Sequence, residues 1–129
     1  MPGIELGLEA VTVHVRDVER ARTFYGGVLG LKELRYVPAG SLTYALPGVP
    51  TVLVLHIMAP QEQGRAPGTV TGLIFAVPDV EAACRAIRSA GGTIADEPAK
   101  VTNPSGTFVR ATIADPDGSE FLLRQRLSE

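Results

Sequence analysis

The sequence has few cysteines, few aromatic side chains and no long apolar run. Cys84 is the one cysteine among 129 residues, so the chain cannot form an internal disulfide. Four Phe, three Tyr and no Trp leave little aromatic surface for stacking against a ligand. No apolar stretch approaches the ~20 residues of a membrane-spanning helix, and the first ten residues lack the basic start and apolar run of a secretory signal. We therefore expect a cytoplasmic protein without a membrane partner.

The charge is also nearly balanced. A formal net charge of -2, from 12 basic and 14 acidic side chains, gives no electrostatic basis for binding nucleic acid. Hydrophobic residues make up 45% and charged residues 20%, which is typical of a globular protein. The length suits one domain over residues 1–129 with a sizeable core.

The main organisational feature is an internal repeat. "VTVHVRDVERARTFYGGVLGL" begins at Val11, and "LIFAVPDVEAACRAIRSAGGT" begins at Leu73, an offset of 62 residues. Each copy starts with alternating apolar residues, as a half-buried strand does, and continues with an Asp suited to the N-cap of a helix. Apolar residues then recur at helical spacing, and glycine ends the helix. The residues that match in register are Val15 with Val77, Asp17–Glu19 with Asp79–Glu81, Ala21 with Ala83, and Gly30 with Gly92.

Three strand-like runs follow each predicted helix. They are about Lys32–Val37, Leu42–Leu46 and Thr51–Ile57 in the first copy, and about Thr93–Ala95, Thr107–Ala114 and Ser119–Gln125 in the second. Proline, glycine and polar residues mark a linker at about residues 59–69. The sequence therefore predicts an α+β fold of two βαβββ modules, at about residues 8–58 and 70–126.

This arrangement resembles the vicinal oxygen chelate superfamily, which includes glyoxalase I, extradiol dioxygenases, fosfomycin-resistance enzymes and bleomycin-resistance proteins. The segment "VRDVERARTFYGGVLGL" is similar to the family's first strand and helix, and "DPDG" (residues 115–118) to its last hairpin turn. The resemblance covers nearly the whole chain. It implies mixed sheets that curl around a cavity for a metal or ligand, helices on the outer face, and a homodimer.

Metal-dependent members of this family usually take ligands from the first and last strand of each module. The first-strand ligand typically lies seven residues before the capping Asp, which gives Ala10 and Gly72. The last-strand ligand is the Glu of a pattern resembling D-P-D-G-N-x-x-E-L, and Leu122 takes its place here, with Val54 as the matching position of the first module. None of these side chains has a donor atom for zinc, nickel, manganese or iron. We therefore predict that the chain holds no metal and needs no cofactor.

Strand alternation divides the remaining residues between two faces. One face is entirely apolar and is expected beneath the helices. Its members are Val11, Val13, Val15, Leu53, Leu55, Leu73, Phe75, Val77, Phe121 and Leu123. The other face combines an apolar floor with a few polar groups, as small-molecule pockets do. The residues predicted to line the cavity are Thr12, His14, Val54, His56, Ile74, Glu120, Leu122 and Arg124.

His14, His56 and Glu120 have the donor atoms of a displaced metal site. Each lies on the cavity face but away from the usual position, Glu120 by two residues or about 6.8 Å. Simpler interpretations are a strand-end role for His14 and a solvated rim position for His56. Glu120 is then a surface carboxylate on the face that also carries Arg124, a side chain that could alternatively meet a ligand anion.

Three functions remain open from the sequence. The leading hypothesis is a metal-independent small-molecule binding protein, such as one that sequesters an antibiotic, with the ligand shared between modules across a dimer. The alternative is an enzyme, either a lyase, isomerase or dioxygenase with a metal at His14, His56 and Glu120, or a metal-free enzyme with His14 or Glu120 as general base. The third is an interaction module with a vestigial pocket. Cys84 is expected to be a buried structural thiol.

Overall fold

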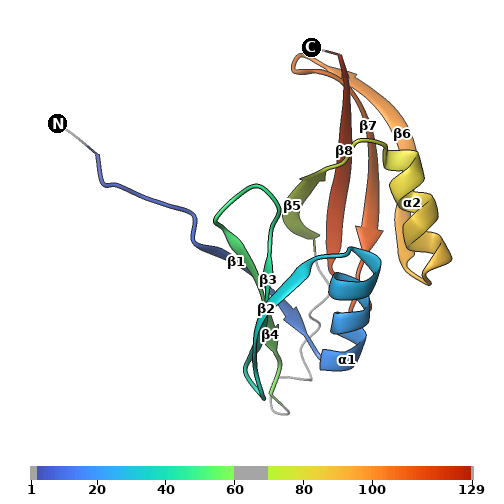
Figure 1. Cartoon of the computed structure of the whole chain (residues 1–129). Helices are drawn as coiled ribbons and strands as arrows, with labels where there is room; N and C mark the ends of the chain where they lie inside the picture. Colours follow the sequence, from blue (N-terminus) through green and yellow to red (C-terminus); the bar gives the residue numbers. More distant parts are fainter. Residues whose placement is uncertain (1–2, 60–69, 129) are drawn as a thin grey trace.

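The computed structural model describes residues 3–59 and 70–128, which form two four-stranded sheets with helices on one side (Figure 1). The first sheet contains β1 (Ala10–Val15), β2 (Lys32–Val37), β3 (Ser41–Ala45) and β4 (Val52–Ile57), with the helical segments α1 (Val18–Ala21) and η1 (Arg22–Val28) after β1. The second contains β5 (Val70–Ala76), β6 (Thr93–Asn103), β7 (Gly106–Ala114) and β8 (Glu120–Ser128), with α2 (Val80–Ser89) after β5.

Both sheets have the same topology. The strand order is β1-β4-β3-β2 in the first and β5-β8-β7-β6 in the second. β1 pairs with β4, and β5 with β8, in parallel, whereas the other neighbours are antiparallel. The α+β prediction of two βαβββ modules with mixed sheets is therefore confirmed. The module bounds within a single domain stay a prediction, and the predicted linker lies, apart from residue 59, outside the described residues.

The two capping aspartates occupy the predicted positions. The Asp17 carboxylate accepts a hydrogen bond from the Arg20 backbone N–H, and Asp79 accepts one from Ala82, both at 3.0 Å. Each carboxylate thereby satisfies a backbone donor that the first turn of a helix leaves open. The repeated Asp explains why both helices begin where they do.

The first helix differs from the expected α-helix after one turn. Residues 22–28 form a π-helix, and the Leu29 N–H donates to the Phe24 carbonyl, five residues earlier, at 2.9 Å. Gly26 in this segment lies against the buried Tyr44, because a Cβ added at Gly26 would be 3.4 Å from the Tyr44 hydroxyl oxygen. A Cβ at this position would make ordinary van der Waals contact, so Gly26 marks the place where η1 packs on β3.

The predicted division of the strands into two faces is confirmed. Val13, Val15, Leu53 and Leu55 of the first sheet are at most 4% exposed, and Phe121 and Leu123 of the second at most 3%. Together with Tyr25, Cys84 and Ile87 from the helical segments, they belong to one core cluster that draws on both sheets. Cys84 is buried as expected, and burial raises the pKa of its thiol.

The prediction for β6 was too short. The strand extends over Thr93–Asn103 rather than over three residues. Pro98 and the charged residues around it hide the strand in the sequence, since proline weakens a strand assignment. β6 is an edge strand, and its register with β7 shifts between Ile94 and Asp96 and again between Asp96 and Ala99. Edge strands and bulges are the places where a sheet tolerates proline.

The DPDG turn joins the second sheet to the first helical segment. Asp115 is 4% exposed, and its Oδ1 accepts from the backbone N–H groups of Asp117 and Ser119, both at 2.9 Å. Across the module boundary, the Arg16 N–H donates to Asp117 Oδ2 at 3.2 Å, and Arg20 Nη2 donates to the Pro116 carbonyl at 3.0 Å. The turn therefore helps to fix one module against the other.

The N-terminal segment behaves differently from the rest of the chain. Figure 1 shows it leaving the body of the molecule as an extended arm on the side opposite the helices. Its apolar side chains alternate, and Ile4, Leu6 and Leu8 are 86%, 88% and 68% exposed. Nothing lies within 4 Å of a Cβ added at Gly3 or Gly7. Within the described part of the chain, no helix has the length and apolar character needed to cross a membrane.

Candidate ligand-binding site

The face of the first sheet that points away from the helices carries its residues in rows across the strands. Thr12 on β1 is the direct partner of Val54 on β4, and Val54 that of Thr43 on β3. Two residues further along, His14 is paired with His56, and His56 with Ser41. The row of Thr12, Val54 and Thr43 has no charged side chain, and the next row has two imidazoles.

The second sheet repeats these rows with other side chains. Ile74 on β5 is paired with Leu122 on β8, and Leu122 with Thr112 on β7. The next row joins Ala76, Arg124 and Arg110. Ala76 corresponds to His14 at the repeat offset of 62 residues, so this second row occupies the place of the row of His14 and His56 in the first sheet. Polar groups thus occupy the same row of both modules, but they differ in kind.

The family's metal positions do not suit a metal in this chain. Ala10 is paired with Val52, and Gly72 lies where the register of β5 with β8 shifts, with a φ of 80°. Val54 and Leu122 face the open side with hydrocarbon side chains. Among residues 3–59 and 70–128, no group of three or more His, Cys, Asp or Glu side chains is placed to hold a metal ion. The donor chemistry of these positions does not match the metal that the fold implies.

The alternative donor set is only partly assembled. The His14 and His56 rings meet edge to face, with their centroids 5.1 Å apart. Glu120 belongs to the other sheet, where its cross-strand partners are Val70 and Ala114. No ion pair between Glu120 and Arg124 is present in the described part of the chain. The structure therefore joins the two histidines and leaves the carboxylate apart from them.

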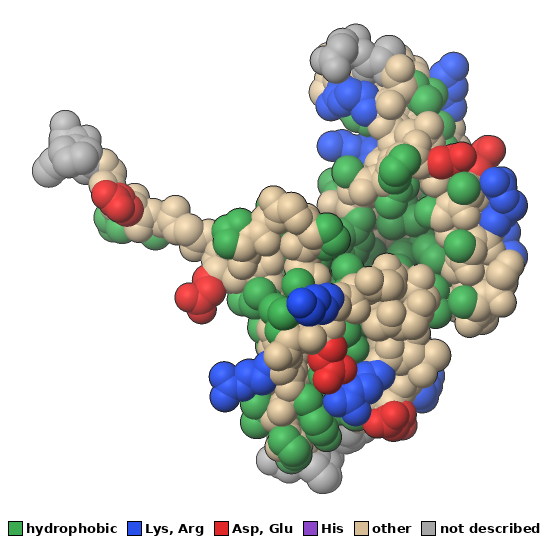
Figure 2. Space-filling view, in the orientation of Figure 1, with side chains coloured by type: hydrophobic (Ala, Val, Ile, Leu, Met, Phe, Trp, Pro, Cys, Tyr) green, Lys and Arg blue, Asp and Glu red, His purple; other side chains and the backbone are tan. Residues whose placement is uncertain are grey.

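An apolar groove of about 590 Å³ lies between the two sheets. Figure 2 shows the hollow between the upper and lower parts of the molecule, with hydrophobic side chains on its walls. β5 supplies one wall with Ile74, Phe75 and Ala76, and the opposite wall includes Leu31 and Val49. Among the described lining residues, Thr51 has the one polar side chain, and its hydroxyl donates to the Leu8 carbonyl at 2.5 Å. The groove therefore offers a small molecule a surface that is almost entirely apolar.

Of the eight residues predicted to line a cavity, Ile74 lines this groove and the other seven lie on the open sheet faces. Sequence reasoning missed Leu31 and Val49, which follow a helix and a strand rather than lying in one. The apolar segments "GVLGL" and "ALPGV", which contain these two residues, were the sequence signal that could have indicated a groove wall. It also missed Arg110, because the sequence did not fix the register of β7 against β8.

A second hollow of about 500 Å³ lies on the helix side, between η1 and the DPDG turn. Its charged groups already have structural partners. Asp115 accepts a hydrogen bond from the Tyr25 hydroxyl at 2.6 Å, and Arg20 binds the Pro116 carbonyl. Burial raises the pKa of Asp115 even though its hydrogen-bond donors act in the opposite direction. These groups hold the fold together, which makes the apolar groove the better candidate for a ligand.

Comparison with known proteins agrees with this fold. Residues 7–123 match the family described as the Glyoxalase/Bleomycin resistance protein/Dioxygenase superfamily, and the chain therefore belongs to that superfamily. Its fold is that of a family whose members include antibiotic-binding proteins. No match is found among curated proteins.

Several solved structures are similar over nearly their whole length. TnmS3, an antibiotic binding protein from Streptomyces sp. CB03234, is 29% identical with a TM-score of 0.76, and the match covers 98% of this chain and 100% of that chain. A glyoxalase/bleomycin resistance protein from the same organism is 30% identical, with a TM-score of 0.69 and coverages of 92% and 100%. A superfamily member from Sphaerobacter thermophilus DSM 20745 is 28% identical, with a TM-score of 0.76 and coverages of 95% and 98%.

Proposed function

We propose that the chain is a metal-independent binding protein for a small, largely apolar molecule. The observation that carries this proposal is the groove of about 590 Å³, whose size and apolar lining are those of small-molecule pockets. The metal positions support it, because Ala10, Val54, Gly72 and Leu122 have no donor atoms. Binding would then depend on burial of apolar surface, with a few polar groups fixing the orientation of the ligand.

The proposal includes a second copy of the chain as part of the site. Apolar residues of the open face, such as Ile74 at 50% exposure, are uncovered in one chain. The N-terminal arm exposes Ile4, Leu6 and Leu8 along one side of an extended segment, and such alternation suits docking on another surface. A homodimer in which the arm of one copy covers apolar surface of the other would bury both and enclose the pocket.

An antibiotic is the ligand class that the comparisons favour. TnmS3 is described as an antibiotic binding protein, and it matches this chain from end to end at 29% identity. Sequestration of such a compound requires only tight burial and no chemical step. The cytoplasmic location expected from the sequence stays a prediction.

A thermal-shift screen with antibiotics and aromatic metabolites tests the proposal, because a ligand of the native state raises the melting temperature. The informative variant is Ile74→Trp, which fills the groove at a residue 50% exposed. We expect it to abolish the ligand-induced shift. Leu34→Trp is the matched control, because Leu34 is 49% exposed on β2 and does not line the groove.

Metal analysis distinguishes the metal-dependent enzyme alternative from the binding-protein proposal. Protein purified without chelator is reloaded with zinc, nickel, manganese and iron and assayed for bound metal. We expect no stoichiometric uptake. Stoichiometric metal that is lost in His14→Ala and His56→Ala would replace the binding-protein proposal with a metal site at the paired histidines.

A further inference from the structure

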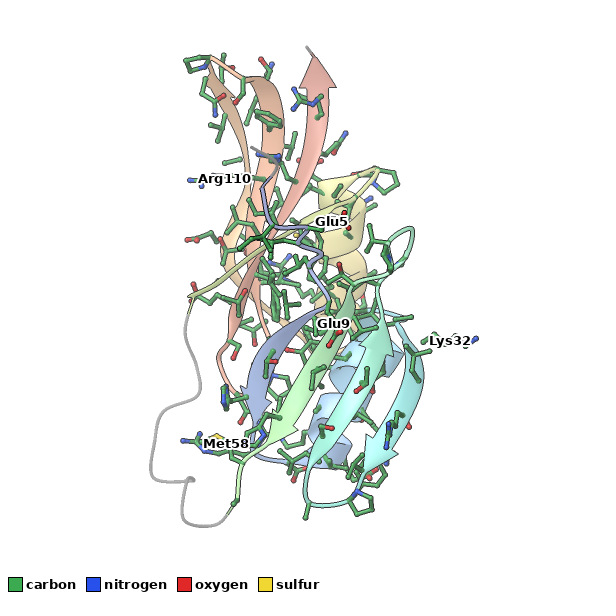
Figure 3. All side chains as sticks on the ribbon, turned by 90° about the vertical axis from the view of Figure 1, so that its left-hand side faces the viewer. Glu5, Glu9, Lys32, Met58 and Arg110 are labelled. Atoms are coloured by element: carbon green, nitrogen blue, oxygen red, sulfur yellow. The ribbon has the colours of Figure 1, made fainter. Side chains whose placement is uncertain are left out.

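The open face of the second sheet carries an arginine cluster, formed by Arg110, Arg124 and Arg126. Arg110 on β7 and Arg124 on β8 are direct cross-strand partners, and Arg126 is the partner of Phe108. Figure 3 shows Arg110 pointing away from the sheet on the side opposite α2. Three guanidinium groups therefore belong to one end of the face that continues from the groove.

The pairing of Arg110 with Arg124 is unfavourable by itself. Like charges directly opposite each other destabilise neighbouring strands. Arg22 and Arg88, by contrast, form ion pairs with Glu33 and Glu97. No acidic side chain of the described residues forms an ion pair with Arg110 or Arg124. An anion from outside the chain would remove this repulsion.

The cluster is held in place by Phe108, whose side chain is 2% exposed. The guanidinium carbons of Arg124 and Arg126 lie 4.5 and 4.6 Å from the centroid of its ring. Arg126 Nη1 also donates to the Ser105 carbonyl at 2.9 Å. Cation–π contact and this hydrogen bond restrict side chains that would otherwise be mobile, so less entropy is lost when they bind an anion.

The cluster also adjoins the apolar groove. Ala76, which lines the groove, is the direct β5 neighbour of Arg124. Ile74 and Leu122 form the adjacent row, so hydrocarbon side chains lead from the groove to the guanidinium groups. Arginine binds carboxylate oxygens through two parallel N–H···O bonds. A ligand with an apolar body and an acidic end matches this sequence of surfaces.

We propose that the arginine cluster is the anion subsite of the pocket and that the ligand is an organic acid. Its apolar body would lie in the groove, and its carboxylate would accept hydrogen bonds from Arg110 and Arg124. This inference rests on the proposed function, because it assigns one end of the ligand to a place in the same pocket.

The test compares 2-naphthoate with its neutral analogue 2-naphthamide by calorimetric titration of the full chain. We expect 2-naphthoate to bind at least about tenfold more tightly, because hydrogen bonds to charged groups are the stronger ones. Arg110→Gln and Arg124→Gln should remove this preference while binding of 2-naphthamide persists. Arg85→Gln is the matched control, because it removes the same charge from an exposed position on α2.

Equal affinity for the two probes, or a preference that survives in both variants, overturns the anion subsite and leaves the binding proposal standing. Failure of both probes to bind, together with no hit in the ligand screen, overturns both. A changed oligomeric state in Arg110→Gln with an unchanged preference would assign the cluster to contact between copies and overturn the subsite.

A stability measurement gives an independent readout without any ligand. Arg110→Gln relieves the repulsion with Arg124, so we expect it to melt at the same temperature as the wild type or higher. A lower melting temperature would mean that the pair is stabilised within the chain, which contradicts the need for an external anion.

Discussion

The Tyr25 hydroxyl donates a hydrogen bond of 2.6 Å to Asp115 Oδ2, and both side chains are buried. The two residues lie 90 positions apart, Tyr25 in η1 and Asp115 in the turn that leads into β8. This contact therefore couples the helical segment of the first module to the DPDG turn of the second.

Loss of this hydroxyl should weaken the fold. Tyr25→Phe leaves a buried carboxylate without one of its donors, at a cost of about 1–3 kcal/mol in the free energy of unfolding. Denaturant unfolding measures the change. Tyr36→Phe is the control, since Tyr36 is 39% exposed and the Arg22 guanidinium over its ring would remain over phenylalanine. Equal stabilities for the two variants would contradict the role of the bond.

The raised pKa of Asp115 should appear in the pH dependence of stability. Because burial raises the pKa of this carboxyl, the native state holds its proton more tightly than the unfolded chain does. Its contribution to stability is complete below the ordinary carboxyl pKa and declines as the pH rises through the native value. Asp115→Asn should therefore flatten the change in unfolding free energy over this range.

Denaturant unfolding from about pH 3 to about pH 7 covers the titration of an ordinary and a raised carboxyl. Asp96→Asn, at an exposed position of β6, provides the comparison. If the unfolding free energy of Asp115→Asn changes with pH in parallel with that of the wild type, titration of Asp115 is not the cause of the pH dependence.

Two glycines near the end of η1 should respond differently to alanine. Gly30 has a φ of 71°, a left-handed conformation that costs an L-residue about 1–2 kcal/mol. Gly27 lies inside η1 and has no atom within 4 Å of an added Cβ. Gly30→Ala should therefore lower the melting temperature, whereas Gly27→Ala should leave it unchanged or raise it slightly. Similar losses in both variants would show that helix packing, and not backbone conformation, decides the effect.

The exposed arm should control association. Leu6→Asp places a charge at a side chain that is 88% exposed in one copy, so it should not disturb the fold of that copy. If the arm docks on a second copy, this charge would have to be buried, and the variant should elute as a monomer while the wild type elutes as a dimer. Light scattering coupled to size exclusion measures both masses. Leu34→Asp is the matched control on β2, and its dissociation to the same extent would remove the special role of the arm.

Much of this fold could be predicted because the same pattern of strand, capping Asp and helix occurs twice in the sequence. Asp17 and Asp79 mark both helix starts, and alternation from Val11 to Val15 assigns faces that burial confirms. The turn at Asp115 was recognisable because the sequence Asp-Pro-Asp-Gly is typical of tight turns and rare within helices and strands. These features depend on neighbours in sequence, which a single chain reveals directly.

The candidate site was harder to predict because it depends on residues distant in sequence. The pairing of Arg110 with Arg124 depends on which residues of β7 and β8 lie opposite each other across the turn between them, and the residue pattern of β7 did not fix that register. The π-helical turns of η1 differ from α-helix by one residue in each hydrogen bond, and no residue type specifies that choice. The groove joins Leu31 to Ile74 through the relative placement of two sheets, which no local pattern encodes.

The row of His14 and His56 and the matching row of Ala76 and Arg124 differ in their electrostatics. In the first sheet His14 and His56 occupy the row that Ala76 and Arg124 occupy in the second. The duplicated architecture repeats the same strand order in both sheets, yet one half carries imidazoles in this row and the other carries guanidinium groups. The two modules therefore share a strand order but differ in the polar groups on their open faces. A ligand with one acidic end would have a single preferred orientation between them.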